Sequence, residues 1–506
     1  MASNTIALDI VKIHESDNVV VAVKALEKGH AITVDNRQIS LKTDVPAGHK
    51  IALHDVPENA KIVKYGHIIG HATQPIAAGE WVHSHNLATD LSGELNYSYQ
   101  PNPKAESRIP AQIPTFLGYR RANGRVGTRN DIWIVNTVGC VNRSAEKIAR
   151  ICNERFAGKG IDGVHTFVHP YGCSQLGDDL GNTRKILAGL MRHPNTGGVL
   201  VMGLGCENNQ MDELLKLAGD IDASRLRYFY SQSVIDEIET GVEAVAELFG
   251  IAKNDRRSEC PASDLVIGLK CGGSDGFSGI TANPLLGKIA DMLSNFGGTP
   301  LLTEVPEMFG AEQQLMNRAV NEAVFSRVVA MINDFKQYFI RHGQPVYENP
   351  SPGNKAGGLT TLEDKSLGAT QKGGTAPVAQ VLDYGEAATP QLGGLALLTA
   401  PGNDGVSTTA EVAAGATIVL FTTGRGTPLG TPVPTLKISS NSAIFQQKPH
   451  WIDFNAGELL EGNTTLNALA ETFFNFILEV ASGKRLAKNE INDYREIAIW
   501  KEGVTL

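Results

Sequence analysis

Four cysteines each follow the apolar run of a predicted β-strand, and this arrangement constrains the fold more than any other feature. The runs read IWIVNTVGC, GVHTFVHPYGC, GVLVMGLGC and DLVIGLKCGG, and they lead to Cys140, Cys173, Cys206 and Cys271. The separations of 33, 33 and 65 residues correspond to one, one and two β-α units. Because parallel strands end at the same edge of an open α/β sheet, we expect all four thiols at one ligand-binding edge.

The chemistry of these thiols points to a soft cation. Thiolates prefer iron, zinc or an iron–sulfur cluster over magnesium or calcium. Six cysteines in 506 residues are too few for a disulfide scaffold, and the chain has no CxxC pair. The strand-end cysteines are therefore predicted to bind a single ion or a cluster. The alternative is that each is a small buried residue at a strand end, as we expect for Cys152 and Cys260.

Composition limits the class of protein. Acidic residues number 54 and basic residues 45, which gives a formal charge of −9 and argues against a nucleic-acid partner. The first residues, MASNTIALDIVKIHESD, lack the pattern of a secretory signal, and no later apolar run approaches the length of a membrane-spanning helix. We therefore expect a cytoplasmic, soluble homo-oligomer without a membrane partner.

The chain is predicted to be an α/β protein with an additional β module. Residues 1–92 read as short strands separated by turn signals such as EKG, DNR and PAG, and residues 93–114 form a proline-containing linker. A large doubly wound portion follows, in which strands alternate with amphipathic helices. We divide it into an α/β domain carrying the cysteines, 115–345, and a second α/β segment, 346–506.

Two of the cysteine segments also carry acid–base candidates. His169 lies four residues before Cys173 in HPYGCSQLGDD, so its imidazole could act beside a bound metal. Glu207 follows Cys206 and could serve as ligand, base or helix cap. The alternatives are a core histidine with satisfied hydrogen bonds and a purely capping glutamate.

Two glycine-rich loops are candidates for binding an anionic substrate. CGGSDGFSG and TTGRGTPLGTP can present backbone N–H groups to an anion, and neither matches a nucleotide-binding motif. Arg425 in the second loop could bind a carboxylate with two parallel hydrogen bonds, and Lys355 adds positive charge. Tight structural turns are the alternative. The candidates in the first loop are Gly272, Gly273, Ser274 and Asp275.

Histidines concentrate in the β module. His83 and His85 in WVHSHN would share one face of a strand, because side chains alternate with period two. His14 adjoins an aspartate and an asparagine. These three could meet a substrate or ion if the module covers the site, either within one chain or from a neighbouring subunit, although exposed strand histidines are more common.

Long segments of the chain resemble the altronate/galactarate dehydratase family. They include PAGHKIAL, AAGEWVHSHN, YRRANGRVGTRN, YGCSQLGDD, GLGCENNQ, CGGSDGFSGITANP, ENPSPGNKAGGLTTLEDKSLG and HWIDFNAGELLEG. The resemblance implies an amino-terminal SAF-type (β-clip) module joined to a larger α/β catalytic portion. It also implies a hydro-lyase of hexuronate catabolism that depends on a divalent metal, with Fe²⁺ as the usual association and Mn²⁺ as a second candidate. The HSHN and YGCSQLGDD segments look like the altronate branch of the family.

The implied reaction is conversion of D-altronate to 2-dehydro-3-deoxy-D-gluconate and water. On this hypothesis the four cysteines hold the metal, His169, Glu207 and His14 supply acid–base groups, and the glycine loops with Arg425 and Lys355 bind the sugar acid. The related alternative is a galactarate dehydratase. A thiol or iron–sulfur redox protein is the alternative from another class.

Overall fold

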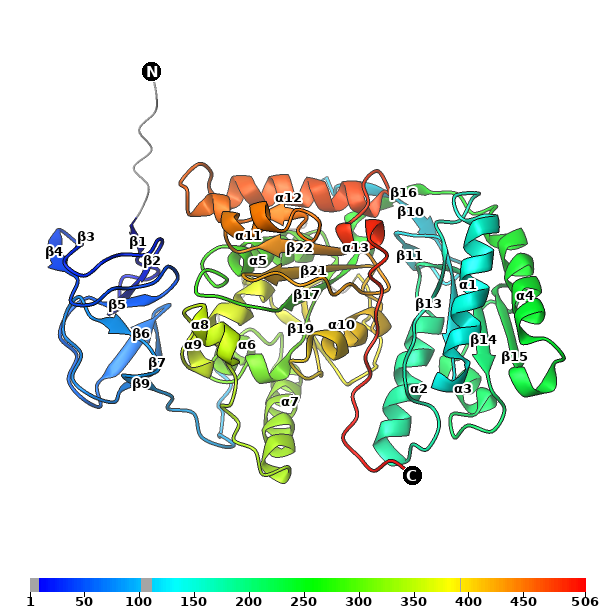
Figure 1. The fold of residues 1–506 in the computed structure, drawn as a ribbon, viewed down its shortest axis with the longest axis horizontal. Coiled ribbons are helices and arrows are strands. Elements are labelled where there is room, and N and C mark those ends of the chain that lie inside the picture. Colours follow the sequence, from blue (N-terminus) through cyan, green and yellow to red (C-terminus); the bar gives the residue numbers. More distant parts are fainter. Residues whose placement is uncertain (1–8, 102–111, 392) are drawn as a thin grey trace, which may run out of the picture.

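The computed structural model describes residues 9–101, 112–391 and 393–506. Figure 1 shows three bodies in a row, with the amino-terminal β module on one side and two α/β bodies beside it. The carboxy-terminal body, built on a seven-stranded sheet, occupies the middle. The predicted class, an α/β protein preceded by a small SAF-like β module, is confirmed.

The module is a set of short antiparallel strands arranged in small sheets of order β1-β2-β5-β8, β3-β4 and β6-β7-β9. Two hairpin turns explain part of this pattern. Asp35 and Asn36 have φ of 49° and 61°, and Tyr65 and Gly66 have φ of 61° and 75°, as two-residue primed turns require. The strands are β1 (Ile10–Val11), β2 (Val19–Ala22), β3 (Ala31–Val34), β4 (Arg37–Ser40), β5 (Lys50–Ala52), β6 (Lys61–Lys64), β7 (His67–Ala72), β8 (Trp81–Val82) and β9 (Leu87–Ala88).

The segment after the module lies against the carboxy-terminal body over its described part. The hydroxyl of Tyr97 contacts Glu312 at 2.5 Å, and the hydroxyl of Tyr99 donates to the carbonyl of Ala319 at 2.8 Å. Residues 102–111 of the predicted linker lie outside the described residues.

The second body contains a parallel sheet of order β13-β12-β14-β15 and a three-stranded antiparallel sheet of order β11-β10-β16. Helices α1 and α4 pack together on one side of the parallel sheet, and α2 packs with α3. The strands are β10 (Thr115–Arg120), β11 (Val126–Gly127), β12 (Asp131–Asn136), β13 (Val164–Thr166), β14 (Thr196–Gly203), β15 (Leu226–Tyr230) and β16 (Ser258–Pro261). The helices are α1 (Asn142–Phe156), α2 (Gly177–Met191), α3 (Met211–Ala218) and α4 (Glu237–Ala252).

The third body is built on a parallel sheet of order β19-β20-β18-β17-β21-β22-β23. Its strands are β17 (Val266–Cys271), β18 (Thr299–Leu302), β19 (Val378–Leu382), β20 (Leu395–Leu398), β21 (Ile418–Thr423), β22 (Thr435–Ser439) and β23 (Phe454–Asn455). Its helices are α5 (Ala282–Asn295), α6 (Glu312–Met316), α7 (Glu322–Arg341), α8 (Pro352–Ala356), α9 (Leu362–Ala369), α10 (Asp404–Ala413), α11 (Ser442–Gln447), α12 (Leu466–Ala481) and α13 (Lys488–Ile491).

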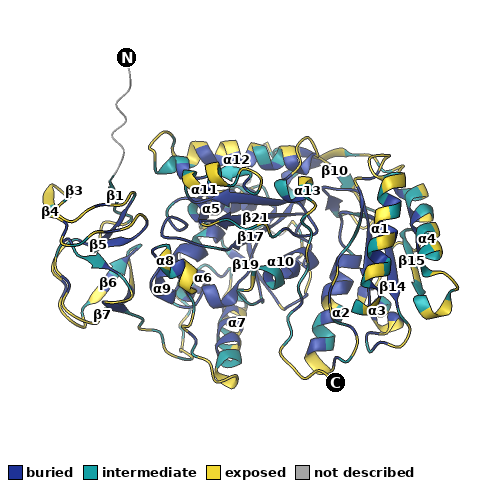
Figure 2. Ribbon diagram, viewed as in Figure 1, coloured by how far each residue is buried: buried dark blue, intermediate teal, exposed yellow. Residues whose placement is uncertain are grey.

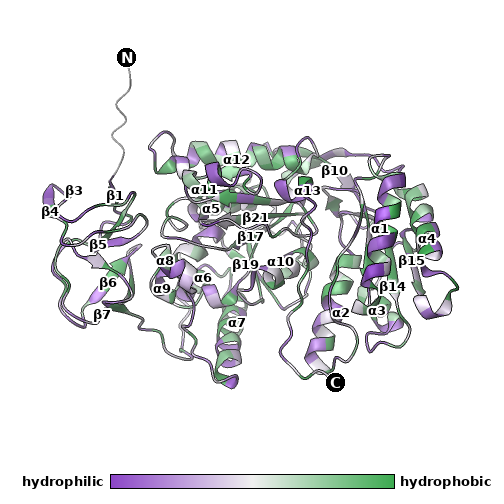
Figure 3. Ribbon diagram, viewed as in Figure 1, coloured by the Kyte–Doolittle hydropathy of each residue, from purple (hydrophilic) through white to green (hydrophobic). Residues whose placement is uncertain are grey.

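Burial follows this layered arrangement. The central strands β17 and β21 are buried along their whole length, as strands covered on both faces should be (Figure 2). Helix α1 is hydrophilic on the side that is exposed, and it buries Ala145, Ile148 and Cys152 on the other (Figure 3). Most buried residues are apolar, so the charged residues enclosed beside β17 are unusual.

The boundary between the α/β bodies differs from the predicted one near residue 345. Strands β17 and β18 belong to the same sheet as β19 to β23, so the division falls between β16 and β17. The reason is the pairing of β16 with β10, in which Cys260 lies opposite Phe116. This antiparallel pair brings the chain back across the second body before the third begins. Among the described residues, no helix is long and apolar enough to cross a membrane.

Candidate active site

An open cleft of about 660 Å³ lies at the carboxyl end of β17. The sheet order reverses here, because β17 pairs with β18 on one side and with β21, which comes later in the chain, on the other. Open α/β sheets bind ligands at such a switch point. The cleft is lined by Cys271 at the end of β17, by Gly272 and Gly273 after it, and by Arg425 after β21.

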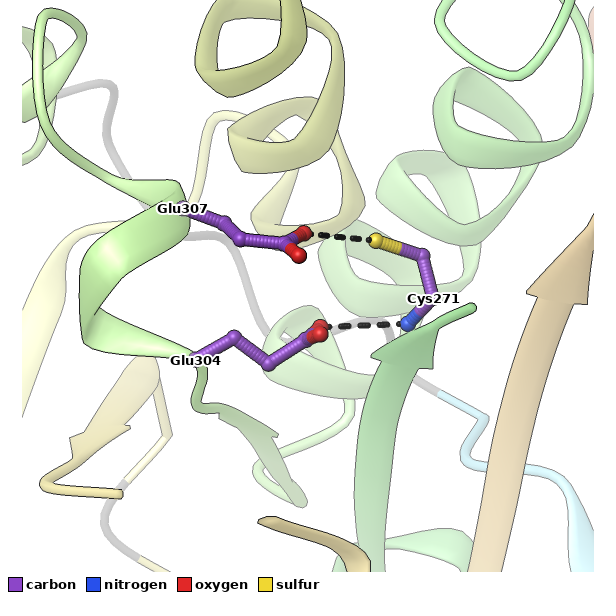
Figure 4. Close-up of side chains that lie close together, drawn as sticks. All are labelled: Cys271, Glu304 and Glu307. Carbon is purple, nitrogen blue, oxygen red and sulfur yellow. Dashed lines mark hydrogen bonds between the residues drawn. The ribbon is translucent and has the colours of Figure 1, made fainter. Parts of the chain in front are cut away.

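Three potential metal ligands meet at its wall. The Sγ atom of Cys271 lies 3.2 Å from a carboxylate oxygen of Glu307, and its backbone N–H donates to Glu304 at 3.1 Å. Figure 4 shows the two glutamates reaching from the segment after β18 toward the end of β17. One ligand atom from each residue lies within 4.8 Å of the others, and all three residues are buried.

Three lysines surround this group. Lys270 contacts Glu304, and it also approaches Asp404 at 3.0 Å. Lys372 lies 2.8 Å from the sulfur of Cys271 and 2.9 Å from Glu304, and Lys365 pairs with Glu307 at 2.8 Å. The residues are Lys270, Cys271, Glu304, Glu307, Lys365 and Lys372; we call them the cleft cluster.

Burial and charge set the protonation states in the cleft cluster. Burial raises the pKa of the Cys271 thiol to about 12, and the negative charges of Glu304 and Glu307 add to this effect. Burial would also raise the pKa of Glu307, but the positive charges of Lys365, Lys270 and Lys372 outweigh it and lower that pKa to about 2. In this state the thiol is protonated and the Glu307 carboxylate is ionised.

Two further features lie at the cleft cluster: an unusual backbone conformation at Glu304 and a buried acid, Glu411. Glu304 has a left-handed backbone with φ of 70°, a conformation that costs energy for a non-glycine residue and is found at functional sites. Glu411 on α10 accepts the backbone N–H of Leu269 at 2.9 Å, and burial holds its pKa well above the ordinary value. Burial therefore favours the neutral form of Glu411 behind β17.

The glycine-rich loops divide into cleft-lining and structural parts. Gly272, Gly273 and Arg425 line the cleft, and among the described residues the Arg425 guanidinium makes one hydrogen bond, a long contact of 3.5 Å to the carbonyl of Gly353. Asp275 is different, because its carboxylate accepts hydrogen bonds from Ser278, Ser440 and Asn441 and holds the loop.

Two other predicted substrate-binding residues are not part of the cleft lining. Ser274 is buried, and its carbonyl accepts a hydrogen bond from Asn354. Lys355 lies on α8, beside residues that do line the cleft. Fewer residues of the predicted anion-binding site therefore line the cleft than the sequence motif suggested.

The β module packs against the cleft loops of its own chain. A Cβ atom on Gly276 would stand 1.9 Å from the carbonyl oxygen of Gly48, so the two backbones touch. Lys50 and Lys64 of the module both bind Asp364 of α9 at 2.8 Å, with all three side chains enclosed. The module is thus fixed by a buried ionic contact to the body that carries the cleft.

The module also places a group of aromatic residues near α8. His49 lies 3.3 Å from the carbonyl of Ala356 and accepts the indole N–H of Trp81 at 3.1 Å. His83 stacks on Trp81, and His85 lies 5.2 Å from it, measured between ring centroids. Burial and the charge of Lys50 lower the pKa of His83 to about 4, so its ring is neutral near pH 7.

His14 does not join this group. Its Nδ1 lies 2.8 Å from the hydroxyl of Ser16, and its backbone N–H donates to Asp17. Asp17 also accepts the backbone N–H of Gly66, so the segment around His14 closes a turn on the module surface.

The prediction that one sheet edge carries all four cysteines is wrong for Cys271. Cys140, Cys173 and Cys206 follow β12, β13 and β14, which are neighbours in the four-stranded sheet. Cys271 ends β17 of the other sheet. The 65-residue interval from Cys206 to Cys271 includes β16, which is the last strand of the second body. The length of this interval alone does not reveal that the next strand belongs to another sheet.

His169 and Glu207 lie with the three cysteines of the second body rather than in the cleft. Both ring nitrogens of buried His169 meet backbone groups, the carbonyl of Asn136 at 2.9 Å and the N–H of Tyr171 at 3.2 Å. The Glu207 carboxylate accepts the backbone N–H groups of Leu204 and Gly205. These contacts are those of a core histidine and a loop-capping glutamate.

The donor set of the cleft fits a first-row divalent ion. One thiolate with two carboxylates is a mixed sulfur and oxygen donor set, whereas calcium and magnesium prefer oxygen ligands only. Binding would release the proton of Cys271 and would displace the ammonium group of Lys372 from the sulfur. Cys271, Glu304 and Glu307 are therefore the residues that could hold such an ion.

Sequence analysis missed the carboxylates and lysines of the cleft cluster. Glu304 and Glu307 lie two and five residues after the end of β18, so their position near a strand end was a signal of the same kind as for the cysteines. Lys270 offered a second signal, because a charged residue inside an apolar strand needs a buried partner. His49 gave no signal that distinguished it from the other module histidines.

Three family models match consecutive parts of the chain. The Altronate/galactarate dehydratase SAF domain matches residues 8–90. The second domain of D-galactarate dehydratase/Altronate hydrolase matches 118–253, and the D-galactarate/Altronate dehydratase C-terminal model matches 262–505. These limits coincide with the three bodies of the structure.

Full-length relatives agree with these matches. Altronate dehydratase of Bacillus subtilis (strain 168) is 54% identical over 98% of this chain and 99% of its own length. Altronate dehydratase of Escherichia coli (strain K12) is 53% identical over 99% and 100% of the two chains. Galactarate dehydratase (L-threo-forming) of the same E. coli strain is 36% identical over 94% and 93%. The chain therefore belongs to the altronate/galactarate dehydratase family.

Proposed function

We propose that this protein is a hydro-lyase that converts D-altronate to 2-dehydro-3-deoxy-D-gluconate and water. The observation that carries the proposal is the difference in identity between full-length relatives, 53–54% to the altronate dehydratases against 36% to the galactarate dehydratase. The proposed setting is hexuronate breakdown in the cytoplasm.

Substrate binding is assigned to the loops after β17 and β21. The guanidinium of Arg425 is exposed at the cleft, and in the part of the chain that the structure describes its one hydrogen bond is the long contact from Nη1 to Gly353, so the guanidinium is available to a carboxylate. The backbone at Gly272 and Gly273 lies in the same cleft wall. Together these groups would hold the sugar acid with its C2 and C3 atoms toward the cleft cluster.

Cys271, Glu304 and Glu307 would hold Fe²⁺, with Mn²⁺ as the second candidate. The ion would supply Lewis-acid stabilisation of the negative charge that develops next to the carboxylate, and would polarise the C3 hydroxyl. The three residues leave the cleft side open, as a catalytic metal site requires.

Two further cleft residues are assigned to proton transfer. The side chain of Asp404 is 39% exposed, and its contact with Lys270 leaves one oxygen available, so it accepts the C2 proton. Burial would lower the pKa of Lys365, but the negative charge of Glu307 outweighs it and raises that pKa. Lys365 is therefore protonated, and it donates to the departing C3 hydroxyl. The enol that remains rearranges to the keto acid.

The proposal is tested by assaying full-length protein, prepared without oxygen and loaded with Fe²⁺, for keto-acid formation from D-altronate and galactarate. We expect kcat/KM for D-altronate to exceed that for galactarate by at least about 100-fold, a difference of about 2.7 kcal/mol in transition-state binding. Faster turnover of galactarate would assign the protein to the other branch. Absence of keto acid from both substrates would refute the lyase activity.

A further inference from the structure

Three of the six cysteines are exposed, and these three follow adjacent strands of one sheet. They are Cys140 after β12, Cys173 after β13 and Cys206 after β14. The three strands are neighbours in the sheet, in the order β13-β12-β14. The remaining three cysteines are buried, which is the usual state of a free cysteine. None of the exposed three lines the candidate active-site cleft. Their exposure and common position therefore need a separate explanation.

The three cysteine loops are bonded to one another in a triangle. The N–H of Gly139 donates to the carbonyl of Tyr171, and the N–H of Asn209 donates to the carbonyl of Gly172, both at 2.9 Å. The side chain of Asn209 closes the triangle by donating to the carbonyl of Thr137 at 2.9 Å. Each cysteine is within three residues of one of these bonds, so the three thiols belong to one rigid edge.

Close backbone approach holds this edge together. A Cβ atom on Gly172 would stand 2.0 Å from the carbonyl oxygen of Thr137, and one on Gly139 would stand 2.7 Å from the carbonyl oxygen of His169. Only glycine fits at such separations. Glu207 adds a contact with the hydroxyl of Thr137. The residues beside the cysteines thus fix the loops, while the thiols remain exposed.

Each of the three cysteine loops leads into a helix. Helices α1, α2 and α3 begin two, four and five residues after Cys140, Cys173 and Cys206. Helix N-termini carry partial positive charge from unpaired N–H groups, and none of these three is capped by a side chain at its N-cap residue.

The spacing of the thiols excludes a preformed site for one ion. In the described residues, Cys271, Glu304 and Glu307 are the one group of three ligand atoms that lie within 4.8 Å of one another. At least two of the three exposed sulfurs therefore stand farther apart than that. A cluster of several metal atoms can join thiolates that one ion cannot.

We propose that Cys140, Cys173 and Cys206 bind an iron–sulfur cluster of the four-iron class, with one iron left without a protein ligand. Each thiol loses its proton when it binds iron, and iron and sulfide come from outside the protein. This site is distinct from the cleft cluster, so the protein would hold two separate metal centres in neighbouring bodies.

The test begins with the full-length protein prepared without oxygen. We expect about four acid-labile sulfides per chain, a broad visible absorption, and protection of Cys140, Cys173 and Cys206 from alkylation that is lost when the cluster is removed. Sulfide is the decisive readout, because a single ion in the cleft brings none. Purified protein that cannot be reconstituted with sulfide, and whose three thiols stay reactive, would overturn the proposal.

Variants separate the cluster from the cleft. Cys140→Ser, Cys173→Ser and Cys206→Ser should each lower bound sulfide at least about fivefold, whereas Cys152→Ala, in the same body, should retain it. Glu307→Gln should lose iron from the cleft and keep its sulfide, so failure of the proposed dehydratase function and failure of the cluster are distinguishable. Thermal unfolding identifies any variant that does not fold, and the alkylation experiment on unmodified protein then decides. Retention of sulfide by a triple serine variant would overturn the proposal.

Discussion

Glu307 links the two kinds of group that make up the cleft cluster. One of its carboxylate oxygens accepts a hydrogen bond from the thiol of Cys271, and the other forms an ion pair with the ammonium group of Lys365. The same carboxylate is a proposed ligand of the metal. A change at this residue therefore acts on metal binding and on the position of Lys365 together.

Glu307→Gln should lower kcat/KM for D-altronate at least about 100-fold, because it removes an ionised ligand and leaves Lys365 without its charge partner. Bound Fe²⁺ at limiting metal concentration should fall as well. Glu348→Gln is the matched control, since Glu348 lines the same cleft and is exposed. Equal iron content and turnover in both variants would refute the metal-ligand assignment.

Arg425→Lys tests the carboxylate contact by a different readout. Lysine retains the charge but cannot form two parallel hydrogen bonds. We expect KM for D-altronate to rise about tenfold with kcat nearly unchanged. Lys355→Ala should leave both constants within about twofold, because Lys355 is not part of the cleft lining. A fall in kcat alone would assign Arg425 to the chemical step.

At the scale of elements, the loop after β17 joins the cleft to the β module. Gly272 and Gly273 line the cleft, and Gly276 touches Gly48 of β5's preceding turn. A displacement of the module must therefore move a loop that binds the substrate in our proposal.

Gly276→Ala should weaken this contact, because the added methyl group would overlap the carbonyl of Gly48. We expect a loss of about 2 kcal/mol in the free energy of unfolding and a rise in KM. Gly353→Ala is the control in the same cleft, since a Cβ atom there meets open space. Urea unfolding measures the difference. Equal stability of the two variants would contradict tight packing of the module on the loop.

Sequence patterns predicted local elements better than their assembly. Strand runs ending in cysteine located β12, β14 and β17 correctly, because an apolar run bounded by glycine is a local signal. Which strands share a sheet depends on contacts far apart in the chain. Strand β16 pairs with β10, with Cys260 opposite Phe116, and this pairing completes one sheet before β17 begins the next. The sequence around these two residues does not indicate that they pair.

The candidate site shows the same limit. Cys271 and Arg425 were found because they lie in glycine-rich loops next to strands. Lys365 lies on α9 and Lys372 on the following 3-10 helix, residues 370–373, and they join the cleft cluster because this 3-10 helix packs beside β17 and β18. From the sequence alone, a lysine on a short helix is expected to be exposed to solvent.

For the whole molecule, the ionic contact between module and body makes stability depend on pH. Burial would raise the pKa of Asp364, but Lys50 and Lys64 outweigh it and hold that pKa below its ordinary value. A carboxyl group of this kind contributes its full stability above its unfolded pKa of about 3.9, and the contribution is lost as pH falls through the lower folded value. The unmodified protein should therefore lose part of its stability below about pH 4.

Asp364→Asn should remove this acid dependence and destabilise the protein near neutral pH, since two enclosed ammonium groups lose their counter-charge. The expected loss is about 3–5 kcal/mol. Asp35→Asn is the control, because Asp35 pairs with Lys12 at the surface with 66% of its side chain exposed, and it should change stability by less than about 0.5 kcal/mol. Unfolding free energies measured from about pH 3 to 7 decide the matter. Parallel curves for Asp364→Asn and the unmodified protein would show that the module is held by its apolar and backbone contacts, and that the two lysines do not depend on this carboxylate.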